Sequence, residues 1–286
     1  MDSIYRSTTG EELIRGWCLG RLAAWQVPHE RKTLTVKGAM THVVLAGAGT
    51  TTVVFVPGTN FNAAASLPLA SALITSGYRV LLVDVPGQPG LSSGQRALGS
   101  GRLSWYGAWL SEVIEKISSE PVAVMGHSFG AAIALSSDSP RIDRLVLVSP
   151  GGLTELRLSP GLLAASAAWF LRPAPMHSAR LLRAMLAPGH PPREELVTWM
   201  TLVARHARSS GAPGAAALPA RPLPRLVVTG AHDVFLPPRR LGPAVRCTLG
   251  AELGVVAGAG HLVVEECPDY LATLLKSAGR TASEGP

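Results

Sequence analysis

Cysteine is scarce in this chain. Cys18, Cys247 and Cys267 are the only cysteines in 286 residues, and their spacing fits no disulfide framework, metal site or redox motif. We therefore expect them to be small buried apolar side chains in a reducing compartment, which predicts a cytoplasmic protein. The first residues, MDSIYRSTTGEELIRG, carry an acid at the second position and no apolar stretch, so no secretory signal is predicted.

Long apolar runs and lysine are also lacking. The longest apolar run, GLLAASAAWFL at 161–171, is well short of the roughly 20 residues that a membrane helix needs, so no membrane span is expected. The net charge of +7 comes almost wholly from arginine. These arginines are scattered, and the chain has no recognition helix or platform of stacking aromatics, so nucleic acid is not an expected partner. A weak attraction to acidic partners is compatible with the charge.

The apolar residues are arranged as in a layered α/β protein. With 47% hydrophobic residues, the chain can bury the core of one large domain. A helix is predicted at 11–26, with Leu13, Trp17 and Ala24 on one face, and a hairpin follows. Short apolar runs then alternate with helical patterns, which predicts a mostly parallel sheet covered by helices on both faces. The predicted strands are TTVVFV, RVLLVDV, VAVMG, RLVLVSP, PRLVVTG and AELGVVAG.

One stretch interrupts this alternation. Residues 151–222 are rich in Leu and Ala, contain no run typical of a strand, and are broken at RPAP and APGHPP. We interpret them as a helical cap inserted into a core made of residues 1–150 and 223–286. A last helix is expected at about 268–277, followed by an untethered tail.

The sequence VAVMGHSFGAAIAL contains G-x-S-x-G between an apolar strand and a helix of small residues. This is the context in which the motif forms a sharp turn that exposes a nucleophilic serine, here Ser128. Side chains two residues before and after that serine would collide, which explains Gly126 and Gly130. We interpret the neighbouring His127 as a bystander.

A serine nucleophile needs a base and an acid that orients the base. In this kind of sheet the order along the chain is serine, acid, histidine, each in a loop after a strand. Asp233 follows PRLVVTG and His261 follows AELGVVAG, so these two residues complete the predicted triad with Ser128. A helix cap for the aspartate and a hydrogen-bonded core position for the histidine are the structural alternatives.

Such a triad also needs backbone N–H groups that stabilise a negative oxygen. We expect one from Phe129, which follows the serine, and one from the loop after TTVVFV. In that loop Thr59 is the first choice and Asn60 the alternative.

The chain resembles the α/β-hydrolase superfamily. The similarity runs from VVFVPGTNF through LLVDVPGQPGLSSG, VMGHSFGAA and VVTGAHDVFLP to GAGHLVVEECPDYL, and so spans nearly the whole chain. It implies the α/β-hydrolase fold, a structural role for Asp84, a cavity mouth shaped by the segment after LLVDVPG, and a cap that selects the substrate. The N-terminal helix and hairpin are similar to those of a bacterial group of esterase-like members. One departure is Pro57-Gly58, where most members have His-Gly.

We therefore predict a serine carboxylesterase that acts on a hydrophobic small molecule. The alternatives are a thioesterase or acyltransferase that acts on a carrier or coenzyme thioester, and a non-catalytic ligand-binding protein on the same scaffold. No cofactor is expected, because the glycine-rich segments match no nucleotide-binding motif. No metal is expected, because His177, His190 and His206 lack metal-ligand spacing. The sequence leaves the oligomeric state open.

Overall fold

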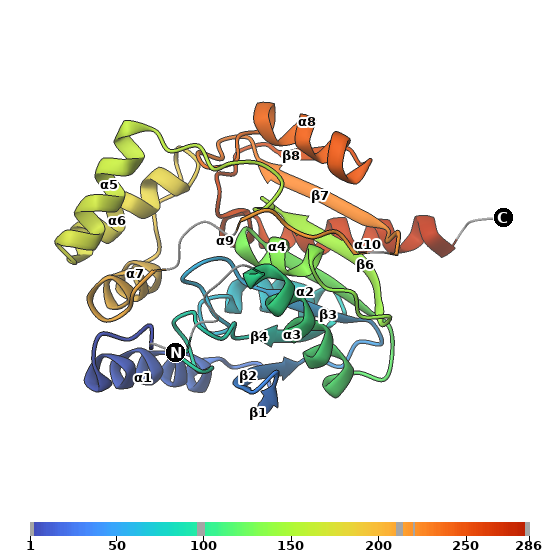
Figure 1. The fold of residues 1–286 in the computed structure, drawn as a ribbon, viewed down its shortest axis with the longest axis horizontal. Coiled ribbons are helices and arrows are strands. Elements are labelled where there is room, and N and C mark those ends of the chain that lie inside the picture. The colour runs from blue at the N-terminus through green and yellow to red at the C-terminus, as the bar shows by residue number, and fades with distance from the viewer. Residues whose placement is uncertain (1–2, 96–100, 210–213, 220, 284–286) are drawn as a thin grey trace.

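In the part of the chain that the structure describes, the central sheet has eight strands in the order β1-β2-β4-β3-β5-β6-β7-β8 (Figure 1). A computed structural model describes residues 3–95, 101–209, 214–219 and 221–283. The pairs β1/β2 and β2/β4 are antiparallel, and the other pairs are parallel. The strands are β1 (His29–Val36), β2 (Ala39–Ala46), β3 (Thr52–Val56), β4 (Arg79–Val83), β5 (Val122–His127), β6 (Ile142–Val148), β7 (Arg225–Gly230) and β8 (Leu253–Val256).

Both faces of the sheet are buried. Along β3, the side chains of Val53 and Phe55 enter one hydrophobic cluster, and those of Val54 and Val56 enter another on the opposite face. Every residue of β3 and of β5 is buried, as expected for central strands of a parallel sheet that is covered on both faces. The predicted mostly parallel sheet with helices on both faces is confirmed.

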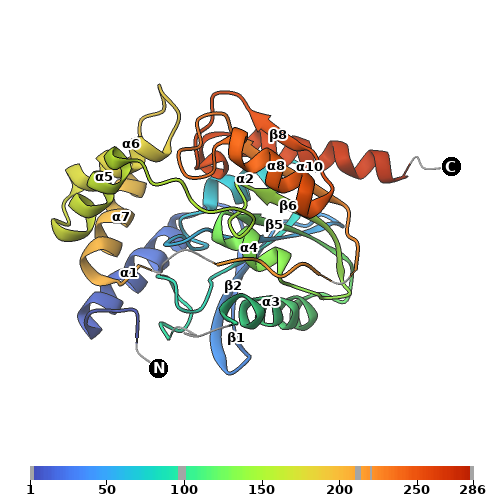
Figure 2. The same cartoon turned by 45° about the horizontal axis from the view of Figure 1, so that its top comes forward.

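Helices cover the two faces of the sheet in separate groups. The helices α1 (Thr8–Ala24), α2 (Leu67–Thr75) and α10 (Pro268–Ser283) contribute to the first cluster, together with the short α9 (Val263–Glu266). The helices α3 (Arg102–Ile117), α4 (Phe129–Leu135) and α8 (Pro238–Leu249) contribute to the second, and Figure 2 shows them in front of the sheet. None of the helices in the described part of the chain is long and apolar enough to cross a membrane.

The described part of the chain between β6 and β7 forms α5 (Pro160–Leu171), α6 (Pro175–Met185) and α7 (Glu194–His206). We call residues 151–222 the α5–α7 segment. Its helices lie to one side of the sheet, with α1 next to α7 (Figure 1). The rings of Trp17 on α1 and Trp199 on α7 are 4.6 Å apart between centroids. The N-terminal helix therefore packs on the α5–α7 segment, and its buried side chains belong to the first hydrophobic cluster.

The buried face of α1 differs from the predicted one. The helix begins after Ser7, which caps it by accepting a hydrogen bond from Gly10 N–H. Its inner face is formed by Ile14, Cys18 and Leu22, which are fully buried, whereas Leu13 is 48% exposed. A spacing of four residues along a helix defines this face, and the prediction placed it one position away.

Three further features differ from the sequence analysis, one because it was missed and two because the expectation was wrong. The helix α8 was not predicted, because Gly242 and Pro243 interrupt its sequence, although Leu241, Val245 and Leu249 are buried at helical spacing. Cys247, on this helix, is exposed and Cys267 is partly exposed, so only Cys18 is the expected buried thiol. The last helix continues to Ser283, where the sequence predicted a tail.

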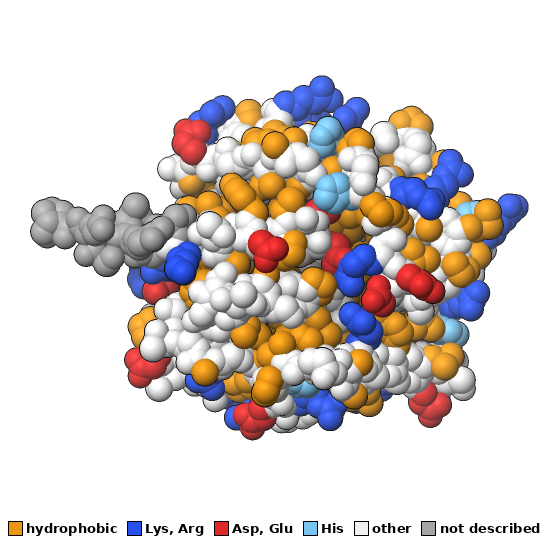
Figure 3. All heavy atoms as spheres, turned by 180° about the vertical axis from the view of Figure 1, so that it is seen from behind, with side chains coloured by type: hydrophobic (Ala, Val, Ile, Leu, Met, Phe, Trp, Pro, Cys, Tyr) orange, Lys and Arg blue, Asp and Glu red, His pale blue; other side chains and the backbone are white. Residues whose placement is uncertain are grey.

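The surface seen in Figure 3 carries basic, acidic and apolar side chains side by side. The arginine and lysine side chains on this face lie at several separate places and are not gathered in one patch. Ion pairs between Arg193 and Glu265 and between Arg21 and Glu195 bring opposite charges together on the described part of the chain. The excess of positive charge is therefore distributed on this face.

Candidate active site

Ser128 lies on a sharp turn between β5 and α4. Its backbone has φ 51° and ψ −110°, a conformation that a residue with a side chain rarely adopts, and its N–H donates to the Val148 carbonyl at 2.9 Å. A Cβ atom on Gly126 would lie 2.5 Å from the Gly130 carbonyl oxygen, and one on Gly130 would lie 2.0 Å from the Val56 carbonyl oxygen. The two glycines of the motif are therefore required by close backbone approach.

His261 reaches the serine from the loop after β8. Its Nε2 is 3.1 Å from Ser128 Oγ, and its Nδ1 is 2.9 Å from Asp233 Oδ2. Ser128 lies more than 100 positions before Asp233 and His261 in the sequence, yet the three residues form one hydrogen-bonded chain. The structure thus brings together the three side chains that the sequence singled out.

Asp233 is buried and held as an acceptor. Its Oδ1 accepts the N–H groups of Phe235 at 2.9 Å and Leu236 at 2.8 Å, and its Oδ2 accepts the hydroxyl of Thr229 at 3.0 Å. Burial alone would raise the pKa of Asp233, but the charge and hydrogen bond of His261, with the Leu236 N–H, hold that pKa well below its usual range. The carboxylate is therefore charged when it faces the imidazole.

The backbone of His261 is fixed by the α5–α7 segment. Its N–H donates to the carbonyl of Met185, the last residue of α6, at 2.7 Å. A Cβ atom on Gly260 would lie 2.3 Å from the same carbonyl oxygen, so only glycine permits this approach. The ring of Phe235 packs against the imidazole, with centroids 4.8 Å apart.

His127, interpreted from the sequence as a bystander, contacts the catalytic candidates directly. Its Nε2 is 2.9 Å from the His261 carbonyl oxygen, and the two imidazole centroids are 5.1 Å apart. Burial, followed by the proximity of His261, lowers the pKa of His127 from 6.5 to about 3. It therefore remains neutral at physiological pH, and Nε2–H is the donor to the carbonyl.

The loop after β3 packs on the serine turn. A Cβ atom on Gly58 would lie 2.9 Å from His127 Nδ1 and 3.3 Å from Ser128 Cβ. Among the described residues, no acceptor binds the N–H groups of Thr59 and Phe129, whereas Asn60 N–H donates to Gln88 Oε1 at 2.9 Å. Of the two candidates in this loop, Thr59 is the one whose N–H is unused.

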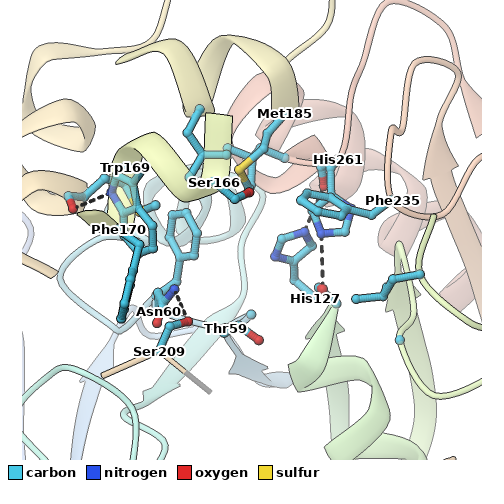
Figure 4. A pocket seen from close by; sticks show the side chains of 18 residues that line it. Thr59, Asn60, His127, Ser166, Trp169, Phe170, Met185, Ser209, Phe235 and His261 are labelled. Carbon is cyan, nitrogen blue, oxygen red and sulfur yellow. Dashed lines mark hydrogen bonds between the residues drawn. The ribbon is translucent and has the colours of Figure 1, made fainter. Parts of the chain in front are cut away.

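A cavity of about 360 Å³ has Ser128 and His261 in its lining. Figure 4 shows the side chains that line it. It is lined by side chains from the strand-end loops and from α5, α6 and α7, and no lysine, arginine, aspartate or glutamate is among its described lining residues. Its polar groups are hydroxyls, one amide and two imidazoles. The apolar lining residues are Phe61, Leu156, Trp169, Phe170, Leu181, Met185, Met200, Phe235 and Leu262.

Asp84 and the segment after it form hydrogen bonds with the backbone of the loop that follows β3. The Asp84 carboxylate accepts the N–H groups of Ala63 at 2.7 Å and Leu91 at 2.8 Å, which fits the structural role that the resemblance implied. The described residues 86–95 do not line the cavity. Their contribution to the site is indirect. The Gln88 side chain accepts a hydrogen bond from the N–H of Asn60, which does line the cavity.

The sequence analysis missed the residues that hold the site in place. His127 adjoins the serine but was set aside, and nothing in the sequence links Gln88, Met185 or Trp199 to the loops that they contact. A place for Phe235 near the site could have been inferred from the sequence, because it follows Asp233 by two residues. In the described part of the chain, no cluster of His, Cys, Asp and Glu side chains is arranged to hold a metal.

Comparisons with solved structures give the same fold. A hydrolase of Bacillus subtilis covers 95% of this chain and 99% of its own length, with a TM-score of 0.79 and 18% identity. Carboxylesterase CesB of the same organism covers 94% of this chain and 98% of its own, with a TM-score of 0.78 and 17% identity. Its naproxen esterase covers 95% and 99%, with a TM-score of 0.77 and 18% identity. At these identities the likeness is one of fold.

Sequence comparison adds a relative and a family. A 2-hydroxy-6-oxononadienedioate/2-hydroxy-6-oxononatrienedioate hydrolase of Cupriavidus pinatubonensis is 34% identical over 128 residues, which are 41% of this chain and 38% of that protein. The chain thus matches well under half the length of this curated relative. The family model of the alpha/beta hydrolases matches residues 53–274, a range that contains the serine turn, the acid and the histidine. By this match the chain belongs to the alpha/beta hydrolase family.

Proposed function

We propose that this protein is a serine esterase that hydrolyses carboxylic esters of hydrophobic small molecules. The observation that carries the proposal is the hydrogen-bonded chain from Ser128 Oγ through His261 to Asp233, at 3.1 and 2.9 Å, on the floor of an apolar cavity. An alcohol activated in this way attacks acyl groups, which supports the proposed reaction.

In the first half of the reaction, His261 Nε2 takes the proton of Ser128 Oγ while the oxygen attacks the ester carbonyl carbon. Asp233 holds Nδ1–H, which fixes the tautomer and stabilises the imidazolium. The negative carbonyl oxygen is stabilised by the N–H groups of Thr59 and Phe129. This assignment is supported by the two unused N–H groups and by the hydrogen bond that already occupies Asn60 N–H.

In the second half, the imidazolium gives its proton to the leaving alcohol, and the acyl group remains on Ser128. Water enters, His261 takes one of its protons, and the hydroxide attacks the acyl carbon. The proton then returns to Ser128 Oγ as the carboxylic acid leaves. The steps balance without any further reactant.

The substrate class follows from the cavity. We propose that the α5–α7 segment (151–222) is a cap that selects the substrate above a core formed by 1–150 and 223–286. A cavity of about 360 Å³ with apolar walls suits a small acyl or aryl group. The name of the Cupriavidus relative indicates a substrate with two carboxylates, and such a dianion needs cationic partners that the described lining residues do not provide. A neutral ester is therefore favoured.

The proposal is tested with p-nitrophenyl esters of increasing acyl length and with a fluorophosphonate probe. We expect turnover of the esters, and stoichiometric labelling that is lost in Ser128→Ala. Faster turnover of acyl-thioesters than of matched oxygen esters would instead favour the thioesterase or acyltransferase alternative. Labelling without turnover of any ester would favour a ligand-binding protein.

A further inference from the structure

Asn60 has an unusual backbone conformation next to Thr59. Its φ is +66°, in the left-handed region. The Phe61 N–H donates to the Gly58 carbonyl at 3.1 Å, so residues 58–61 form a β-turn with Asn60 at its third position. Glycine and asparagine are the residues that tolerate a positive φ at this position. The turn that carries the Thr59 N–H therefore depends on Asn60 keeping this conformation.

Three separate parts of the chain hold Asn60. Its N–H donates to Gln88 Oε1 at 2.9 Å, its carbonyl accepts Trp199 Nε1–H at 2.8 Å, and its side-chain Nδ2 donates to Ser209 Oγ at 2.9 Å. Asn60 itself is 8% exposed. Because the backbone groups on both sides of its Cα are bound from outside the turn, rotation of either peptide would break a buried hydrogen bond.

Trp199 is the contact from α7. Its side chain is fully buried, and its ring lies against Trp17 of α1 at 4.6 Å between centroids with 33° between planes. An indole has a single N–H donor, and here the Asn60 carbonyl receives it. The aromatic contact fixes the plane of the indole, and the plane fixes the direction of the donor.

We propose that Trp199 is a positioning residue that holds the Thr59 N–H in place for the negative oxygen of the transition state. The inference rests on the proposed esterase function. Trp199 does not line the cavity, so it acts through the Asn60 carbonyl and not by touching the substrate. A donor displaced by about 1 Å loses much of its effect on the transition state, with rate losses of about 10²-fold.

The other indole of the α5–α7 segment shows the contrast. Trp169 Nε1–H donates to the Met200 carbonyl at 2.9 Å, so its hydrogen bond stays within the segment. Trp199 instead crosses from the segment to the loop after β3. The position of α7 is thereby linked to the geometry of the predicted oxyanion site.

The test is Trp199→Phe, which keeps an aromatic ring against Trp17 and removes the N–H. The matched control is Trp109→Phe on α3, since Trp109 is also fully buried and its Nε1–H donates to Thr41 Oγ1 at 2.9 Å. Both variants lose one buried indole hydrogen bond, but only Trp199→Phe loses a hydrogen bond to the loop that carries Thr59. Rates are taken per active site, titrated to completion with fluorophosphonate, so that unfolded protein does not count.

For Trp199→Phe we expect kcat on p-nitrophenyl acetate to fall about 10–100-fold with KM nearly unchanged, because the lost interaction belongs to the transition state. Binding of a trifluoromethyl ketone, which forms an oxyanion on Ser128, should weaken by a similar factor. Trp109→Phe should lose thermal stability and keep its kcat. A kcat for Trp199→Phe equal to that of the wild type or of Trp109→Phe would overturn the inference.

A second variant covers the case in which Trp199→Phe does not fold. Trp17→Leu leaves the indole N–H but removes the ring that orients it, and a smaller loss of kcat, again without a change in KM, is expected. An unchanged kcat there would also contradict the inference. The proposed function fails separately, if Ser128→Ala retains activity.

Discussion

The loops at the carboxyl ends of the strands and the α5–α7 segment contribute different things to the cavity. The loops provide an alcohol, an imidazole and a carboxylate whose mutual distances are about those of ordinary hydrogen bonds. The α5–α7 segment provides mainly apolar wall, with Trp169, Leu181 and Met200 among its buried members. The two parts of the chain thus present different groups to the cavity, and we expect mutations in the two parts to have different kinetic effects.

The separation is not complete, because hydrogen bonds join the two regions. The His261 N–H donates to the Met185 carbonyl. The Glu266 carboxylate accepts the Ala187 N–H at 2.6 Å and the Gly260 N–H at 2.8 Å, and so ties the end of α6 to the histidine loop. The segment therefore holds the reactive loops in place in addition to covering them.

The largest effect is expected from removing the reactive groups of the loops. Ser128→Ala or His261→Ala should lower kcat by about 10⁵–10⁶-fold, because either change abolishes the attacking alkoxide. The measurement is ester hydrolysis, with a thermal melt to show that the fold is kept. Substantial activity in either variant would contradict the assignment of the reactive groups to the strand-end loops.

The acid should be the next largest contributor. Asp233→Asn is nearly isosteric but presents an amide to Nδ1, which disfavours the productive tautomer, so a loss of about 10⁴-fold in kcat is expected. Asp143→Asn is the control, since among the described residues this partly exposed aspartate on β6 pairs only with its neighbour Arg144. Equal activities for the two variants would remove Asp233 from the mechanism.

Substitutions in the apolar wall of the cavity should change the preference for acyl chain length. Leu181 and Leu182 are adjacent buried residues of α6, but only Leu181 lines the cavity. Leu181→Ala should raise KM for a long acyl ester about 10-fold while changing kcat little, because it removes contact with the chain. Leu182→Ala should reduce stability and leave the ranking of acyl lengths as it is. Identical shifts in both variants would show that Leu181 acts only through stability.

The smallest expected effect concerns pH. Burial, aided by the nearby His261, lowers the pKa of His127 from 6.5 to about 3, so the folded protein keeps it neutral while the unfolded chain binds a proton. Stability should therefore fall as the pH drops from about 6.5 towards about 3. His127→Gln should flatten this decline in Tm, whereas His190→Gln, at an exposed position of the α5–α7 segment, should not. Parallel Tm curves for all three proteins would contradict this role of His127.

The candidate reactive residues could be found from the sequence because each has a local signal. The glycines of the serine turn, and a polar residue directly after an apolar strand, are visible within ten residues of sequence. The helix α8 and the inner face of α1 were missed for an equally local reason. The sequence of α8 is interrupted by Gly242 and Pro243, which are poor helix formers. In α1 apolar residues lie around much of the helix, so the sequence does not indicate which face is buried.

The contacts that hold the site could not be found in this way. The pairs Trp199 with Asn60 and His261 with Met185 join residues far apart in the chain. Buried donors and acceptors must be paired, but many partners satisfy that need equally well, so the sequence does not say which pairs form. The apolar composition of α5 likewise gives no indication of which of its side chains enter the cavity.

By itself, the sequence determined the layered α/β architecture and the positions of a serine, an acid and a histidine at strand ends. It could do so because the period of the apolar residues and the demands of a tight turn are local properties of the chain. Only the tertiary structure decided which side chains wall the cavity and which N–H groups remain unused beside the serine. Those outcomes depend on how distant segments pack against one another, and packing is decided by the whole chain at once.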